Sequence, residues 1–525
     1  MTADAVVIGA GPNGLVAANL LADAGWEVVV LEAAAEPGGA VRTAEVIEPG
    51  FRHDLFSAFY PLGSASPVLS ALDLDIRWSH APEVLAHVLP DDRSVLLSRD
   101  IDKTAASVAT FAEADGDAWR SEYENFREIR DHLLAALFTP FPPVRSGLKL
   151  AARMGAADLL RFGRLATMPV RTYGARRFQG EGGQLLLAGN ALHTDLGPGQ
   201  AGSAIFGWLL GMLGQDLGFP VPEGGAGSLT AALVRRLEAR GGQVVCDRPV
   251  TRVLTSGGAA TGVVDATGQT TKARRAVLAT VPAPVLYGKL LDPDVLPPRL
   301  HGDLENFVWD DATFKVDWAL SKPIPWSAED VRGAGTVHLG ADLTGLADYS
   351  ADLAAGRVPE HPFLLLGQMT TADATRSPAG TETAWAYTHV PRGRSWDADE
   401  LRRFADRMEA VVERHAPGFR SAIRGRYIQG PADLERANPS LVEGSTNAGT
   451  AAVHQQLFLR PVPGLGRADT PVDRLYLAGA SAHPGGAVHG GPGANAARAA
   501  LARNRRVGGS VYNGLIRGLH RALYR

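Results

Sequence analysis

A short, uninterrupted apolar run opens the chain at residues 5–8 (AVVI) and is typical of a parallel strand with both faces buried. Apolar residues with helical spacing follow over residues 15–24, and Gly25 is suited to the position just after a helix. A second apolar run at residues 26–31 (WEVVVL) predicts another strand. These segments together predict one βαβ unit of about 30 residues, and therefore a parallel sheet at the start of the fold.

Similar patterns return in two later parts of the chain. In the first, a helix is expected over residues 230–239, and short strands are expected at residues 243–246, 250–254, 263–264 and 275–280. In the second, residues 472–480 predict a strand that runs into a turn, and an alanine-rich helix is expected over residues 494–502. The chain therefore shows strand and helix patterns of the same kind at widely separated places.

Composition narrows the class of protein. The 525 residues are 45% apolar and 21% charged, which is usual for a globular chain long enough for more than one domain. A net charge of −4 argues against a nucleic-acid binder, which would carry a basic domain. Cys246 is the only cysteine, so an internal disulfide framework is excluded and no metal site of the zinc or iron–sulfur kind is expected.

A cytoplasmic location is expected from the absence of targeting patterns. No basic segment precedes the first apolar run, as it would in a signal peptide. The most apolar stretch, residues 204–213, is too short to span a bilayer.

The predicted turn between the first strand and helix has the sequence GAGPNG, which fits the pattern GxGxxG. Its first glycine permits the tight turn, its second lets backbone approach a pyrophosphate, and its third lets the helix pack closely on the strand. Glu32 ends the second strand, where a carboxylate can accept hydrogen bonds from a ribose. The βαβ context predicts a dinucleotide site formed by Gly9, Gly11, Pro12, Asn13, Gly14 and Glu32.

Two further glycine-rich segments carry a resemblance to a known family. Gly38, Gly39 and Arg42 follow Glu32, and near the C-terminus five glycines fall within residues 485–493. With residues 438–449 and 458–464, these segments resemble the flavin amine oxidase superfamily and, within it, the phytoene desaturase-like, phytoene-dehydrogenase-related proteins.

The resemblance implies FAD as the cofactor and identifies further residues that would contact it. A thiol link at the C-terminal motif is excluded, because no cysteine follows Cys246, so the FAD is expected to be non-covalent. Val250 matches a position whose backbone meets the adenine, although it is equally interpretable as a core strand residue. The cofactor-binding residues implied by the resemblance are Gly38, Gly39, Arg42, Val250, Gly479, Ala480, Val488, His489, Gly493 and Ala494.

The fold class that follows is α/β, with a discontinuous Rossmann-like FAD-binding domain of the glutathione reductase-like GR2 type and an interleaved α+β substrate domain. The FAD domain is expected at residues 1–70, 225–290 and 445–525, and the substrate domain at residues 71–224 and 291–444. No second GxGxxG follows a predicted strand, so no NAD(P)H domain is expected. Electrons are expected to pass to oxygen, a quinone or another acceptor.

Three side chains are candidates for catalysis. Residues 314–320 alternate so that Lys315 and Asp317 share one face of a strand, and Lys315 weakly matches a lysine that lies near the flavin in flavin amine oxidases. An ion pair between Lys315 and Asp317 is the competing interpretation. His483 and His489 flank the C-terminal glycine loop and are expected either to orient substrate and transfer protons or only to cap that loop.

The sequence thus predicts an FAD-dependent oxidoreductase that removes hydride equivalents from a lipophilic small molecule, in the manner of a desaturase or dehydrogenase. A flavin amine oxidase is the alternative within enzymes. A non-catalytic binding protein or chaperone of the same fold is the alternative outside them, although the complete set of cofactor motifs argues against it.

The C-terminal tail carries one more feature. No acidic residue occurs from residue 474 to residue 525, against eight arginines. An apolar face recurs every four residues, opposite arginines at positions 517, 521 and 525; its members are Val511, Leu515, Leu519 and Leu523. A basic amphipathic helix of this kind is suited to peripheral contact with a membrane, or to packing on its own domain.

Overall fold

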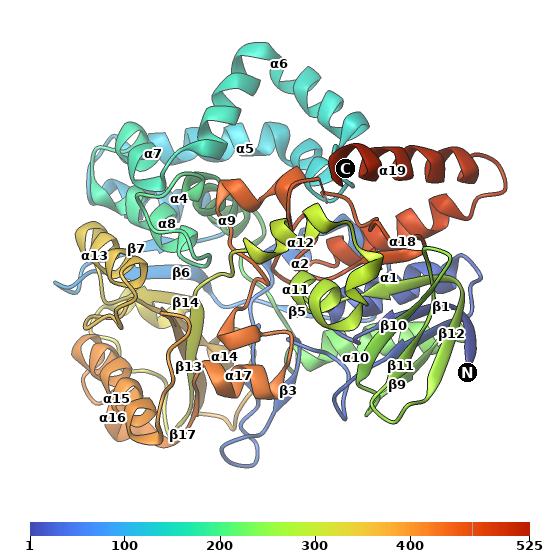
Figure 1. Cartoon of the computed structure of the whole chain (residues 1–525). Coiled ribbons are helices and arrows are strands. Elements are labelled where there is room, and N and C mark those ends of the chain that lie inside the picture. The colour runs from blue at the N-terminus through green and yellow to red at the C-terminus, as the bar shows by residue number, and fades with distance from the viewer. Residues whose placement is uncertain (465, 525) are drawn as a thin grey trace.

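Two seven-stranded β-sheets organise the residues that this computed structural model describes, 1–464 and 466–524 (Figure 1). The first sheet has the order β10-β11-β12-β1-β2-β9, with β18 paired to β12. The second has the order β17-β13-β16-β15-β14-β6-β7.

Distant parts of the chain contribute the strands of the first sheet. They are β1 (Thr2–Ile8), β2 (Val28–Leu31), β9 (Gln243–Val245), β10 (Val250–Ser256), β11 (Ala259–Asp265), β12 (Thr270–Ala279) and β18 (Leu475–Leu477). β1 lies between β2 and β12 and is parallel to both. A parallel strand in this position is buried on both faces, which explains its continuous apolar sequence.

Three helices cover one face of the first sheet: α1 (Pro12–Asp23), α10 (Gly227–Glu238) and α18 (Gly491–Arg503). Ala5 and Val7 of β1 pack toward these helices, whereas Val6 and Ile8 enter a second apolar cluster on the opposite face. The predicted βαβ unit is therefore confirmed, and its helix begins directly at the glycine-rich turn.

The second sheet is built from β6 (Glu83–Val88), β7 (Ser94–Leu97), β13 (Ala312–Leu320), β14 (Ala334–Leu339), β15 (Leu364–Gln368), β16 (Glu382–Val390) and β17 (Ile423–Gln429). Its pairs are antiparallel except for β14 with β6. One face packs on α15 (Ala398–His415) and α16 (Phe419–Ala422), and Phe314, Val316, Trp318 and Leu320 of β13 enter that core. The predicted alternation of β13 is confirmed.

Helices cover the other side of the second sheet and the top of the molecule in Figure 1. They are α4 (Ile101–Ala109), α5 (Asp115–Leu137), α6 (Val144–Thr167), α7 (Val170–Arg177), α8 (Glu181–Ala191) and α9 (Ser203–Leu217). The C-terminal helix α19 (Gly509–Tyr524) packs against α18 and α12. No helix of the described residues is long and apolar enough to cross a bilayer.

Shorter elements connect these layers. The strands among them are β3 (Thr43–Ala44), β4 (His53–Asp54), β5 (Trp78–Ser79) and β8 (Val221–Pro222). The helices are α2 (Pro61–Ser64), α3 (Pro67–Ser70), α11 (Ala283–Val285), α12 (Pro298–Glu305), α13 (Leu343–Ala354), α14 (Met369–Ala372) and α17 (Pro431–Ala437). Single 3-10 or π turns are η1 (Leu286–Leu290), η2 (Pro293–Val295), η3 (Glu329–Gly333), η4 (Val442–Gly444), η5 (Val453–Gln455) and η6 (Leu457–Leu459).

The α/β fold class predicted from the sequence is confirmed. Every strand of the first sheet falls within residues 1–70, 225–290 or 445–525, and every strand of the second falls within residues 71–224 or 291–444. The exact domain boundaries stay a prediction.

Candidate functional site

The glycine-rich turn after β1 is packed so closely that side chains would not fit. Gly9 has a φ of +95°, which disfavours any residue with a side chain. A Cβ atom at Gly14 would lie 2.0 Å from the carbonyl oxygen of Gly9. The N-terminus of α1 is therefore held tight against the end of β1, which leaves its unpaired N–H groups available for an anion.

The carboxylate of Glu32 stabilises this turn through hydrogen bonds. One oxygen accepts a hydrogen bond from Ala10 N at 2.6 Å and the other accepts one from Ala34 N at 2.9 Å. A carboxylate has about four lone-pair sites, so both oxygens retain the capacity to accept from a ribose. The chain after β9 passes beside Glu32, because Arg248 N donates to the Glu32 carbonyl, and this brings Val250 to the same end of the sheet.

The Gly38–Gly39 loop folds onto the turn. Gly38 and Gly39 have φ values of +126° and +54°, and Gly38 N donates to Ala10 O. A Cβ atom at Gly39 would lie 3.1 Å from the Cα of Gly11. Arg42 fixes the loop by donating to the Gly39 carbonyl at 3.1 Å and to Ala437 O at 2.7 Å.

The C-terminal glycine loop reaches the same place. A Cβ atom at Gly493 would lie 1.9 Å from the carbonyl oxygen of Asn13, so the first turn of α18 touches the first turn of α1. A Cβ atom at Gly479 would lie 2.2 Å from Thr280 O, beside the turn after β1. Two helix N-termini, one from each end of the chain, therefore converge.

These residues fit FAD. Glycines at 14, 479 and 493 let the turns and helix starts of the two motifs approach one another more closely than any side chain would allow. The Oδ1 atom of Asn13 is buried without a hydrogen-bond partner in the described part of the chain. Two positive helix ends suit a pyrophosphate and the electron-rich edge of a flavin. Sequence-predicted Pro12, Ala480, Val488 and Ala494 lie within these same loops and helix starts.

His489 is held by the loop that it flanks. Its Nδ1 atom accepts from Gly491 N at 3.0 Å, and its Nε2 atom pairs with Gly486 O at 2.9 Å. Burial lowers the pKa of His489 to about 4, so the ring is neutral at pH 7. These contacts favour the capping interpretation, because both ring nitrogens are already used.

His483 is different, because its Nε2 atom is buried without a hydrogen-bond partner among the described residues. Burial lowers its pKa to about 4, and its ring lies edge-on to Phe141. A neutral imidazole with a free nitrogen can still accept or donate one proton. Of the two histidines, His483 is therefore better prepared to contact a ligand.

Lys315 lies apart from the histidines, on β13 of the second sheet, and is buried. Its Nζ atom is 2.5 Å from both carboxylate oxygens of Asp317 and donates to Asp54 O at 3.0 Å. Burial raises the pKa of Asp317 to about 6, while Lys315 opposes that rise. The ion pair that competed with the catalytic interpretation is present, and it also joins the second sheet to the loop of β4.

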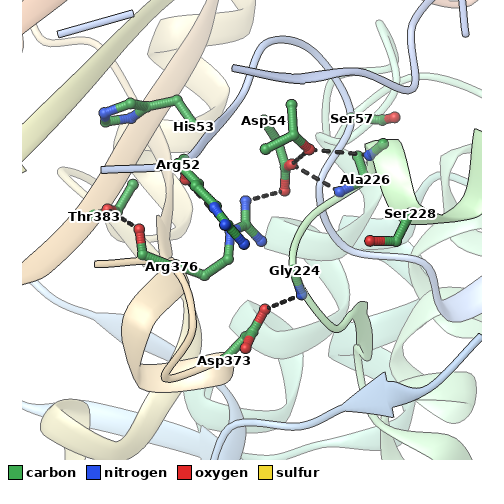
Figure 2. Close-up of polar contacts among 12 residues, drawn as sticks. Arg52, His53, Asp54, Ser57, Gly224, Ala226, Ser228, Asp373, Arg376 and Thr383 are labelled. Atoms are coloured by element: carbon green, nitrogen blue, oxygen red, sulfur yellow. Dashed lines mark hydrogen bonds and ion pairs between the residues drawn. The ribbon is translucent and has the colours of Figure 1, made fainter. Parts of the chain in front are cut away.

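Sequence reasoning missed a buried ion pair beside this lysine (Figure 2). Arg376 and Asp54 are both fully buried, and Arg376 Nη2 is 2.6 Å from Asp54 Oδ2. The other Asp54 oxygen accepts from Ala226 N at 2.9 Å and Thr43 Oγ1 at 2.6 Å, at the start of α10. Neither residue belongs to a recognisable motif, so no local signal could have identified the pair, which we call the Asp54–Arg376 junction.

An aromatic wall continues from the junction along the second sheet. Lys315 Nζ lies 6.0 Å from the ring of Trp385. Trp385 stacks on Tyr387 with a centroid distance of 5.9 Å, and Phe59 packs on Trp385 at 6.1 Å. Trp318 and Trp326 instead belong to the core on the opposite face of the sheet.

Comparison with known proteins agrees with these observations. The sequence profile of the family described as flavin-containing amine oxidoreductases matches residues 13–382. Pyridine nucleotide-disulfide oxidoreductase domain-containing protein 2 of Rattus norvegicus is 29% identical over 94% of this chain and 92% of its own length. One of the chains of limonene dehydrogenase from Castellaniella defragrans is 27% identical over 94% of each sequence. A zeta-carotene-forming phytoene desaturase of Myxococcus xanthus is 25% identical over 91% and 90%.

Solved structures share the fold at lower identity. An oxidoreductase from Methanosarcina mazei superposes with a TM-score of 0.63 at 15% identity, covering 95% of this chain and 100% of its own. Cyclohexylamine oxidase from Brevibacterium oxydans gives a TM-score of 0.56 at 15% identity, with 100% of both chains covered. At this identity the likeness is one of fold.

Proposed function

The chain belongs to the family of flavin-containing amine oxidoreductases, and on that premise we propose that it oxidises a lipophilic small molecule as a dehydrogenase or desaturase. The cofactor is FAD, which supplies the electron-accepting chemistry when bound. We propose further that it is held without a covalent bond, since Cys246 is the only cysteine and lies outside the C-terminal motif.

The observation that carries the proposal is the convergence of the α1 and α18 N-termini across the Gly493–Asn13 contact. This convergence supports a single cofactor site formed by both motifs. Limonene dehydrogenase and the phytoene desaturases align over nearly the whole chain, and by their names they act on apolar hydrocarbons or polyenes. The aromatic wall of Phe59, Trp385 and Tyr387 suits a lipophilic substrate.

The protein's own residues have separable roles in this proposal. Residues Gly9, Gly11, Pro12, Asn13, Gly14, Glu32, Gly38, Gly39, Arg42, Val250, Gly479, Ala480, Val488, Gly493 and Ala494 bind and orient the cofactor. His483 offers a neutral, unpaired nitrogen, and His489 holds the glycine loop in shape. Lys315 is fixed by Asp317 and positions the β4 loop.

The test of function is anaerobic. Purified protein is expected to be yellow, and its flavin absorbance is expected to bleach when the correct substrate is added from a panel of polyenes, oxygenated terpenoids and amines. Bleaching by amines alone would support the amine oxidase alternative instead. Colourless protein that takes up no FAD would overturn the enzyme proposal and favour a non-catalytic binding protein. Readmitting oxygen or a quinone to the bleached protein identifies the electron acceptor.

Removal of the Glu32 carboxylate is predicted to weaken FAD binding. Glu32→Ala removes the acceptor of two backbone N–H groups and of the ribose, so the dissociation constant of FAD is expected to rise by about ten- to a hundredfold. Flavin retained after gel filtration, measured by absorbance, reports the change. Glu27→Ala, which alters an exposed carboxylate on the same sheet, is the control, and equal flavin retention in both variants would contradict the assignment.

We also propose that the α19 edge of the molecule contacts an anionic membrane. The helix packs on its own domain through Tyr512 and Tyr524, whose hydroxyls donate to Asp469 and to Pro463 O. Leu523 is partly buried by this packing, while Arg525 lies outside the described residues. The other members of the apolar stripe stay exposed: Val511 by 67%, Leu515 by 70% and Leu519 by 41%.

Helix α6 also carries exposed apolar side chains: Leu148 and Leu160 are 66% and 76% exposed, and most charged residues of this helix are basic. Exposed apolar side chains beside basic ones are the pattern that binds anionic lipid surfaces.

Vesicle flotation tests the membrane proposal. The full-length protein is expected to float with phosphatidylserine vesicles, to float less at high salt, and to stay in solution with phosphatidylcholine alone. The triple change Val511→Ser, Leu515→Ser and Leu519→Ser is expected to lower the affinity for phosphatidylserine vesicles at least about tenfold, because each substitution removes exposed apolar area. Unlike removal of the whole helix, this triple substitution leaves the packing of Tyr512 and Tyr524 intact. No flotation of the unaltered protein would end the proposal.

A further inference from the structure

A chain of polar rings runs beside the aromatic wall and has no counterpart in the sequence motifs. The hydroxyl of Tyr387 on β16 lies 3.1 Å from Nδ1 of His193, which follows α8. Nε2 of His193 lies 3.1 Å from Nε2 of His338 on β14. His87 on β6 stands next to His338, with ring centroids 5.9 Å apart.

The strand register places this chain on the face of the second sheet that carries Lys315. Lys315 pairs with Tyr387, Tyr387 with Leu365, Leu365 with His338, and His338 with His87. Paired residues of adjacent strands lie on the same face. Since Lys315 bonds to the β4 loop of the cofactor part, Tyr387 is presented on the same side of the sheet.

Exposure to solvent differs along this chain of rings. His87 and His338 are fully buried, whereas Tyr387 and His193 retain partial exposure. Tyr387 also ends the aromatic wall, since Trp385 stacks on it. Tyr387 thus ends this chain of rings at a partly exposed position, next to the aromatic wall.

His338, at the buried end, determines which ring nitrogens of His338 and His193 carry a proton. His338 Nδ1 has no hydrogen-bond partner among the described residues and faces Gly189, where a Cβ atom would lie 2.4 Å from it. A buried N–H without an acceptor is rarer than a buried acceptor without a donor, so the proton of His338 is placed on Nε2. His338 then donates to His193, and His193 donates through Nδ1 to the Tyr387 oxygen.

In this arrangement the O–H of Tyr387 has no acceptor within the described residues and is free to donate to a ligand. The rings also carry no formal charge at neutral pH. Burial lowers the pKa of His193 to about 3, that of His87 to about 4 and that of His338 as well. Neighbouring histidines add to the effect at His193 and His338. Burial raises the pKa of Tyr387. The nearby charges of Lys315 and Asp317 are already paired with each other, so the uncharged Tyr387 donor favours a neutral oxygen over a carboxylate or an ammonium group.

We propose that Tyr387, aligned by His193 and His338, donates a hydrogen bond to an uncharged oxygen of the substrate, so that the substrate is an oxygenated lipophile, an alcohol or carbonyl compound, rather than a hydrocarbon, amine or acid. The inference rests on the proposed function, because it assumes that the Lys315 face of the sheet lines the substrate site. Tyr387 is a specificity residue in this role, and His193 and His338 are positioning residues.

A matched set of probes with one carbon skeleton tests the inference: farnesol, farnesene, farnesylamine and farnesoic acid. Each is titrated into FAD-loaded protein while the visible spectrum of the flavin is followed. Farnesol is expected to bind about five- to tenfold more tightly than farnesene, the effect of one hydrogen bond to a neutral group. The amine and the acid are expected to bind more weakly than the alcohol.

Tyr387→Phe is expected to remove the preference for farnesol and to leave the affinity for farnesene unchanged. Tyr173→Phe is the matched control, since that phenol donates to Glu122 in the helical layer at 2.6 Å, and it is expected to keep the preference. His338→Leu is expected to reduce the preference in part, because His193 loses its donor.

Equal affinity of the unaltered protein for farnesol and farnesene would overturn the inference, and so would an unchanged farnesol preference in Tyr387→Phe. Bleaching by hydrocarbons with no such preference would overturn the inference and leave the proposed function standing. A protein that is bleached by no member of the wider substrate panel would overturn the function itself.

Discussion

Gly493→Ala is expected to cause the loss of the folded, flavin-containing protein. The new methyl group would stand 1.9 Å from the carbonyl oxygen of Asn13, which is backbone and has no side-chain torsion with which to move away. Either α18 or α1 must shift, and both contribute their N-termini to the cofactor site. Overpacking of this kind costs at least about 3 kcal/mol of unfolding free energy where no flexible group can yield. Urea unfolding and flavin content after purification measure the two consequences.

Gly514→Ala provides a matched control for this prediction. Gly514 is also a helical glycine, in α19, but a Cβ atom there would meet no atom within 4 Å. The substitution is expected to leave flavin content unchanged and to stabilise the protein by up to about 1 kcal/mol, since alanine favours the helix. If Gly493→Ala behaved like this control, the close approach of the two helices would be wrong.

Breaking the Asp54–Arg376 junction is expected to have the second large effect. Arg376→Met leaves the fully buried Asp54 carboxylate without its guanidinium, and removing one partner of a buried pair costs about 3–5 kcal/mol. The backbone N–H of Ala226 and the hydroxyl of Thr43 still donate to Asp54, so we expect the lower part of that range. Denaturant unfolding of the FAD-loaded protein measures it.

A double-mutant cycle separates the ion pair from simple packing. Adding Asp54→Asn to Arg376→Met removes the uncompensated charge and is expected to recover part of the lost stability. Arg357→Met serves as the control, because Arg357 is paired with Asp352 at the surface, where an ion pair contributes less than about 1 kcal/mol. A cost for Arg376→Met no greater than for Arg357→Met would contradict the buried junction.

The junction matters for function because it joins three segments that are remote in sequence. Asp54 follows the Gly38–Gly39 loop, Ala226 begins α10 of the first sheet's helical layer, and Arg376 precedes β16 of the second sheet (Figure 2). Lys315 adds a further bond to the same loop. Together these contacts fix the cofactor part relative to the sheet face that carries Tyr387.

The sequence predicted the βαβ start, the α/β class and the elements of the first sheet, because strand and helix periodicities are local. It also predicted the cofactor motifs, since tight turns and helix starts impose requirements on glycines that are only a few residues apart. Glu32 was assigned from its spacing alone, and the structure places its carboxylate on the glycine-rich turn.

The sequence could not decide the roles of side chains outside those motifs. Lys315 matched a motif weakly, and only the paired strands show that Asp317 and Asp54 O occupy its ammonium group. Nothing in the sequence favoured His483 over His489, yet within the described residues Nε2 of His483 has no partner while both ring nitrogens of His489 are hydrogen-bonded. The amphipathic pattern of the C-terminal helix was apparent, but not that Tyr512 and Tyr524 pack inward while Leu515 stays exposed.

By itself, the sequence predicted a dinucleotide site at the first strand, because that motif depends on backbone geometry that neighbouring residues specify, and it predicted through a family resemblance that a second glycine loop belongs to the same site. Only the tertiary structure decided that α1 and α18 meet at Gly493, that Arg376 neutralises Asp54, and that Tyr387, His193 and His338 form one chain. The reason is physical: each of these contacts joins residues far apart along the chain. Their hydrogen bonds and charges are satisfied by partners that no local pattern can identify.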